Sequence, residues 1–111
     1  MLPENITTVV ARNERWNGDA VSEPYEAGWA REAVVFIRAL KQPVGTPPSA
    51  WIEISPDGIH WLREGTEFQM PGEKDAIAVA RLTRFGNWLR VATKFEQGAE
   101  CTVLVTIHFK A

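Results

Sequence analysis

The chain has 111 residues, of which 45% are hydrophobic and 23% charged, and its 12 Lys and Arg against 14 Asp and Glu leave a formal net charge of -2. This length suits one domain, 1–111, and the composition excludes an intrinsically disordered chain. A balance so close to neutral excludes the basic surface of a nucleic-acid binder, so no nucleic-acid partner is expected.

The N-terminal segment shows no pattern of export or membrane insertion. Met1–Asn5 lacks a basic stretch followed by an apolar run, and the longest apolar run, Ala33–Ile37, is far shorter than the ~20 residues of a membrane helix. The sequence therefore predicts cytoplasmic synthesis without a secretory signal, and no membrane partner. A final location in a particle such as a virion is compatible with this pattern.

Residues 1–30 combine one strand with irregular segments. Ile6–Arg12 is predicted as a strand, whereas Ala20–Glu26 is interrupted by Pro24 and is expected to be an edge strand or an extended loop. Trp16 and Trp29 flank a glycine-containing irregular stretch. We interpret residues 1–30 as a partly extended N-terminal arm, which these two tryptophans anchor to the body or to a neighbouring subunit.

Arg31–Leu40 has apolar side chains on both of its alternating faces. The run Val34–Ile37 favours a strand over a helix, because β-branched and aromatic residues prefer strands. Such a strand is expected to be central and covered on both sides, or to dock its outer face on another molecule. Phe36 is therefore a candidate interface residue.

The sequence predicts a β-hairpin in which Trp51–Ile54 and Ile59–Arg63 are the two strands. Pro presets φ in the connecting turn and glycine can adopt the positive φ that closes it, which is typical of a type I turn with a bulge. The turn residues are Ser55, Pro56, Asp57 and Gly58. Trp61 follows the turn and is expected to cover one end of the fold.

The second half of the chain repeats a two-residue period. Ile77–Leu82, Trp88–Lys94 and Cys101–Lys110 alternate as half-buried strands do, and Gly65–Asp75 is predicted as a polar loop. Seven to eight strands with turn residues between them predict an all-β protein, an antiparallel β-sandwich of jelly-roll type.

Catalytic and metal-binding patterns are weak in this sequence. His60 and His108 lie far apart in the chain, no metal-ligand spacing surrounds them, and the single cysteine, Cys101, falls in an apolar alternation typical of a core residue. We predict no enzyme activity, no metal and no cofactor. A minimal cupin-like enzyme that uses the two histidines is the least favoured alternative.

Five tryptophans are many for so short a chain. If Ile52 and Ile54 face inward, Trp51 and Glu53 face outward, and Trp88 and Arg90 share an outer face by the same alternation. An exposed indole offers a flat, rigid surface for a sugar ring or a partner protein. These four side chains are therefore candidate binding residues.

The hairpin from Trp51 to Trp61 contains Ser-x-Asp-Gly-x-x-Trp and resembles the corresponding hairpin of discoidin-like (galactose-binding-like) β-sandwiches. Phe85–Val91 is similar to a later strand of that family, and similar segments occur in small sandwich proteins of phage-like particles. The resemblance covers Trp51–Lys110 and implies the sandwich fold. It also implies structural roles for four residues, Asp57, Gly58, Trp61 and Arg90. The family's pair of terminal cysteines is missing, and its ligand-binding loops do not match.

Two functions follow from these features. The favoured hypothesis is a non-enzymatic structural or assembly protein that docks on a larger, phage-like particle or self-associates as a homo-oligomer. Its partners would then be proteins or further copies of the chain. The alternative is a carbohydrate-binding module that uses exposed tryptophans.

Overall fold

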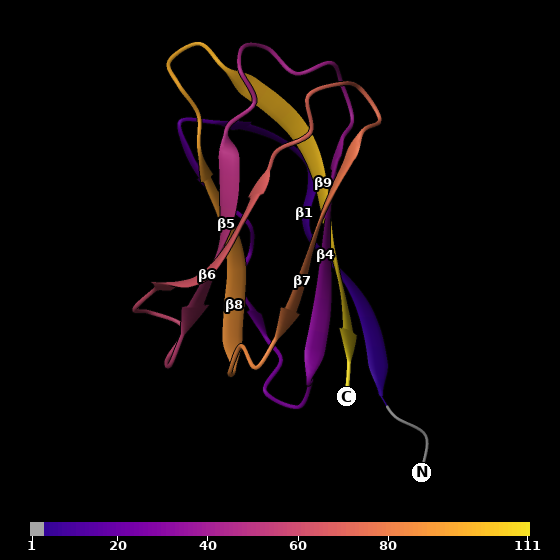
Figure 1. Cartoon of the computed structure of the whole chain (residues 1–111), viewed down its shortest axis with the longest axis vertical. Coiled ribbons are helices and arrows are strands. Elements are labelled where there is room, and N and C mark those ends of the chain that lie inside the picture. The colour runs from indigo at the N-terminus through magenta and orange to yellow at the C-terminus, as the bar shows by residue number, and fades with distance from the viewer. Residues whose placement is uncertain (1–3) are drawn as a thin grey trace.

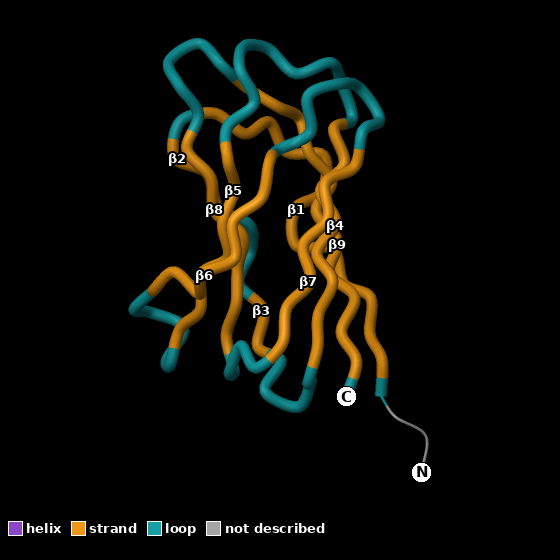
Figure 2. Tube along the Cα trace, in the orientation of Figure 1, coloured by secondary structure: helices purple, strands orange, loops and turns teal. Residues whose placement is uncertain are grey.

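A computed structural model describes residues 4–111 as two antiparallel β-sheets packed face to face (Figure 1). The strands are β1 (Asn5–Asn17), β2 (Asp19–Val21), β3 (Tyr25–Glu26), β4 (Glu32–Ala39), β5 (Ser49–Ser55), β6 (Leu62–Gln69), β7 (Ile77–Thr83), β8 (Trp88–Lys94) and β9 (Glu100–Lys110). Residues 4–111 contain no helix, and hence none that could cross a membrane (Figure 2). The predicted antiparallel β-sandwich is confirmed, with nine strands instead of seven or eight.

The two sheets differ in their strand order. The four-stranded sheet has the order β1-β9-β4-β7, and the five-stranded sheet has the order β2-β8-β5-β6, with β3 also paired to β8. Figure 2 shows the two layers seen edge-on, with β5, β6 and β8 on the left and β4, β7 and β9 on the right. Each layer therefore has one inner face and one outer face.

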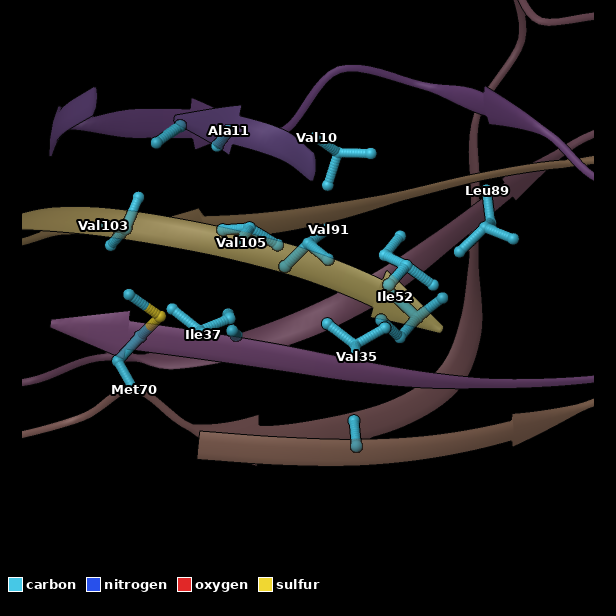
Figure 3. Close-up of a cluster of buried hydrophobic side chains, with 14 of the residues drawn as sticks. Val10, Ala11, Val35, Ile37, Ile52, Met70, Leu89, Val91, Val103 and Val105 are labelled. Carbon is cyan, nitrogen blue, oxygen red and sulfur yellow. The ribbon is translucent and has the colours of Figure 1, made fainter. Parts of the chain in front are cut away.

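The core lies between the sheets because every second side chain of the central strands points inward. Figure 3 shows these side chains meeting from both layers. The aliphatic and aromatic residues with no exposed surface on these strands include Val35, Ile37, Ile52, Leu89, Val91, Val103, Val105, Ile107 and Phe109. The alternating apolar side chains from which β8 and β9 were predicted are thus the side chains that fill the core.

The arm predicted for residues 1–30 is wrong for most of its length. β1 pairs with β9 along its whole length, and Trp16, opposite Cys101, is 3% exposed. β2 and β3 pair with β8, and Pro24 separates them, as its missing N–H requires. Residues 5–26 therefore belong to the sandwich itself. Residues 1–3, at the start of the predicted arm and of the segment inspected for export, lie outside the described residues.

The β5–β6 hairpin differs from its prediction in where the second strand begins. β6 starts at Leu62, and Ile59, which was predicted to begin this strand, is 75% exposed in the turn. The side chain of Asp57 accepts the backbone N–H groups of Ile59 and His60, so these groups cannot join the strand ladder. β6 then continues to Gln69, through residues predicted as a loop.

β4 occupies the position that its sequence suggested. It lies between β9 and β7, and its inner residues Val35 and Ile37 are fully buried. Its outer residues Val34 and Phe36 are only partly buried, because nothing in residues 4–111 lies over this face of the sheet. The strand is therefore central but covered on one side.

Candidate functional site

The outer face of the five-stranded sheet brings together most of the predicted binding residues. Glu53 of β5 lies directly opposite Arg90 of β8, and Ser55 lies opposite Trp88. Trp51 points to the same side, because Ile52 between it and Glu53 is fully buried. Alternation on two neighbouring strands thus builds one surface.

Glu53 is the centre of this surface. Its Oε2 accepts a hydrogen bond from Nε1 of Trp51 at 2.9 Å. Its Oε1 accepts a hydrogen bond from Nε of Arg90 at 2.8 Å and forms an ion pair with Nη2 of the same guanidinium at 2.7 Å. The Glu53 and Arg90 side chains are 17% and 23% exposed, so water screens their attraction less than on an open surface.

Two guanidinium groups stack on two indole rings of the same surface. The Cζ of Arg63 lies 3.9 Å from the ring centroid of Trp51, and the Cζ of Arg90 lies 4.2 Å from that of Trp61. Both distances suit a cation–π interaction. Arg63, Trp51, Glu53, Arg90 and Trp61 therefore form one continuous chain of contacts, which we call the Trp–Arg face.

The β5–β6 turn holds one end of this face in place. Oγ of Ser55 accepts the backbone N–H groups of Asp57 and Gly58 at 3.2 and 2.8 Å. The Asp57 carboxylate accepts the backbone N–H of His60 and pairs with its ring at 2.7 Å, and with the N–H of Ile59 these contacts lower the pKa of Asp57. Gly58 has a φ of +78°, and a Cβ at this position would meet the ring of Trp88 at 3.1 Å. The turn backbone therefore packs directly on Trp88.

The remaining candidate residues lie elsewhere. Phe36 is on the outer face of the other sheet, where its ring is 4.8 Å from that of His108. Trp29 contacts Phe109 edge-on, with 6.0 Å between ring centroids, and is 36% exposed. Trp16 is buried, and its Nε1 donates to Glu14, so it anchors β1 to the body rather than to a neighbour.

The structure does not bring the two histidines together. His60 belongs to the β5–β6 turn beside the five-stranded sheet, whereas His108 lies on the four-stranded sheet. Within residues 4–111, no group of three or more His, Cys, Asp or Glu side chains lies close enough to hold a metal ion. Cys101 is buried, and its desolvation raises the pKa of the thiol.

Sequence analysis missed Arg63 and misplaced Trp61. Arg63 lies opposite Glu53 in the β5–β6 pairing. Trp61 is two residues before Arg63, so the two side chains point to the same side of the strand. Trp61 therefore lies under Arg90 on the outer face instead of covering an end of the sandwich. The signal was present in the Trp-x-Arg spacing, since residues two apart in an extended segment share a face.

Comparisons with known proteins place the fold. No family model and no curated protein matches the sequence. Among solved structures, the chain is similar to the SPBc2 prophage-derived protein YomS, with a TM-score of 0.65 and 9% identity over 100% of this chain and 96% of that one. Similarity to the disulfide-linked pili of Bacillus endospore appendages has a TM-score of 0.49 and 13% identity, over 98% and 90% of the two chains. Similarity to a mitogen derived from Yersinia pseudotuberculosis has a TM-score of 0.47 and 10% identity, over 99% and 86%.

These comparisons establish a shared fold and nothing about partners. The likeness to YomS covers both chains almost completely, so the same sandwich extends over residues that share little sequence. The other two structures have TM-scores below 0.5, and we draw no conclusion from them. The chemistry of the site therefore has to be argued from the Trp–Arg face itself.

Proposed function

We propose that this chain is a non-enzymatic structural or assembly protein that docks on a protein of a larger, phage-like particle. The docking surface is the Trp–Arg face on the outer side of the five-stranded sheet. The observation that carries the proposal is the contact chain through Trp51, Glu53 and Arg90, which gathers residues from two strands on one solvent-facing surface.

The composition of this face is typical of protein interfaces. Tryptophan and arginine are the residues most enriched among those whose truncation costs the most binding energy. A flexible side chain such as that of arginine loses conformational freedom on binding, at an entropic cost of about 0.5–1.5 kcal/mol. Here Arg63 is stacked on Trp51 and Arg90 is held by Glu53 in the free protein, so that cost is reduced.

The phage-like particle is supported by fold similarity. Over its whole length, the fold of the chain is similar to that of a prophage-derived protein, with a TM-score of 0.65. The sequence resemblance of the Trp51–Lys110 region to small sandwich proteins of phage-like particles points to the same class.

A carbohydrate ligand is the competing hypothesis, and the discoidin-like hairpin motivates it. A sugar ring stacks on a free indole face. One face of Trp51 is occupied by the Arg63 guanidinium, and one face of Trp61 by Arg90. A sugar stacking there would have to displace a favourable contact, whereas a protein partner can use the indole edge and the guanidinium together.

The experiment measures co-sedimentation of the purified protein with particles released from the source organism. Arg63→Ala removes an exposed part of the Trp–Arg face without breaking an ion pair, and Arg12→Ala is the matched control on β1. We expect the wild type and Arg12→Ala to co-sediment, and Arg63→Ala to bind at least about fivefold less. A wild type that stays in the supernatant contradicts the proposal. Binding to a glycan array that Arg63→Ala alters would support the carbohydrate alternative instead.

A further inference from the structure

The outer face of the four-stranded sheet is apolar at its centre. The strand registers place Val9, Thr106, Phe36 and Val79 in one row across β1, β9, β4 and β7. Val9 and Val79 are 36% and 39% exposed, and the neighbouring Ile77 is 58% exposed. The row crosses the whole sheet, and covering its exposed apolar side chains with a second surface would be favourable.

Charged groups at one end of this face form no ion pairs with other residues of the segment 4–111. Glu32 and Lys110 are opposite each other in the β4–β9 register, yet neither forms an ion pair among the described residues. A pocket of about 440 Å³ opens beside them, and its lining includes Val34, Arg81 and His108. This end of the face therefore carries one acidic and several basic groups around an apolar hollow.

We propose that this face is the interface of a homodimer, in which two copies pack sheet against sheet. The two-fold axis runs parallel to the strands, between β4 and β9. Such an axis places β4 of one copy over β9 of the other, and β7 over β1, because the strand order β1-β9-β4-β7 is reversed in the facing copy.

The registers then decide which side chains meet. Within each row the order is reversed, so Lys110 faces Glu32 of the second copy, and Phe36 faces Thr106 of the second copy. In the same way Val9 of β1 faces Val79 of the other β7. The two-fold symmetry thus forms the Lys110–Glu32 pair twice, once in each direction. It also brings the apolar row of one copy against the same row of the other. Both rows meet in this way only where the strands of the two copies run nearly parallel to the axis.

The area of the face suits a weak dimer. Four strands spaced about 4.8 Å apart, with four rows of outward residues about 6.7 Å apart, cover roughly 500 Å². Two copies would therefore bury about 1,000 Å² in total, which is the size of a weak interface.

This dimer goes beyond the proposed docking function and does not depend on it. The Trp–Arg face lies on the other sheet, so both copies would present it outward on opposite sides of the dimer. Because the two docking faces point in opposite directions, such a dimer could bridge two particle surfaces, but it could not bind one surface with both copies.

The first experiment measures the mass of the protein by sedimentation equilibrium as a function of concentration. Phe36→Lys places a charge at the centre of the interface, and Ile59→Lys is the matched control on the exposed β5–β6 turn. We expect the wild type and Ile59→Lys to form dimers, and the dimer dissociation constant of Phe36→Lys to rise at least tenfold. A wild type that stays monomeric up to about 1 mM overturns the proposal, as does an unchanged dissociation constant for Phe36→Lys.

The second experiment tests the symmetry by exchanging charges. Glu32→Lys alone and Lys110→Glu alone each bring like charges together across the axis, so each variant should dimerise more weakly than the wild type. Mixing the two variants should restore dimers that contain one copy of each, because both charge pairs are then opposite in sign. Mixtures no more dimeric than the separate variants would overturn the proposed arrangement. A folding defect cannot produce recovery on mixing, so recovery supports it.

Discussion

Glu53 and Arg90 are 37 residues apart in the chain and lie directly opposite each other on β5 and β8. Nη2 of Arg90 is 2.7 Å from Oε1 of Glu53, and the same carboxylate also accepts a hydrogen bond from the Trp51 indole. One half-buried carboxylate thus holds an arginine and a tryptophan in fixed positions. The stability of the sandwich and the shape of its outer face therefore depend on the same contacts.

Removing this carboxylate should destabilise the fold. Glu53→Ala leaves the Arg90 guanidinium without its partner in a site that is only 23% exposed, and we expect the free energy of unfolding to fall by about 1–3 kcal/mol. Urea denaturation measures the change, and the double variant with Arg90→Ala separates the pair interaction from the single losses.

Glu100→Ala is the control for this prediction. The Arg15–Glu100 pair has a 3.9 Å separation and side chains that are 69% and 37% exposed, so its loss should cost less than about 0.5 kcal/mol. Equal losses for Glu53→Ala and Glu100→Ala would show that partial burial of Glu53 adds nothing.

Substitution of Gly58 should cost more than backbone strain alone. Gly58→Ala combines a positive φ of +78° with a close approach of the new Cβ to Trp88, and Gly98→Ala has a φ of +85° with no atom within 4 Å. We expect Gly98→Ala to lose about 1 kcal/mol and Gly58→Ala to lose more, with an altered tryptophan fluorescence spectrum. Similar losses and unchanged fluorescence would mean that the turn does not pack on Trp88.

The Asp57 turn should make stability depend on acid pH. Hydrogen bonds from His60 and Ile59 lower the pKa of Asp57 in the folded protein below its unfolded value of about 3.9. The stabilisation is therefore complete above the unfolded pKa and is lost as the pH falls through the folded pKa. Thermal unfolding between pH 6 and pH 3 should show a steeper loss for the wild type than for Asp57→Asn, and parallel curves would contradict this.

Substitution by alanine should change the free energy of unfolding much more at one isoleucine of the β5–β6 hairpin than at another. Ile52 is fully buried between the sheets, so Ile52→Ala should reduce the free energy of unfolding by about 2–5 kcal/mol. Ile59 is 75% exposed in the turn, so Ile59→Ala should change it by less than about 0.5 kcal/mol. A large loss at Ile59 would instead place it inside a strand, as the sequence predicted.

Sequence analysis worked best where one face of a strand is wholly apolar. Trp88–Lys94 was predicted with the bounds that β8 has, and β9 differs by one residue at its start. β6 was missed over most of its length because its residues are polar on both faces and only pairing with β5 holds them extended. The first strand was predicted only over Ile6–Arg12, whereas β1 continues to Asn17, because the bulges in β1 interrupt its alternation.

The candidate site divides in the same way. Alternation alone placed Trp51 and Glu53 outward on one strand, and Trp88 and Arg90 outward on another. It could not show that Glu53 meets Arg90, or that Arg63 and Trp61 complete the surface. Those contacts depend on which strands are neighbours and on the register between them.

The sequence by itself determined that the chain forms β-sheets and which side chains of its clearest strands lie inside. In a strand, every second side chain faces the core, and this two-residue alternation of apolar side chains can be seen within each short segment of the sequence. Only the tertiary structure decided the strand order, the pairing of distant charges and the two outer faces. Register between strands far apart in the chain is set by how the whole core packs, and no single segment carries that information.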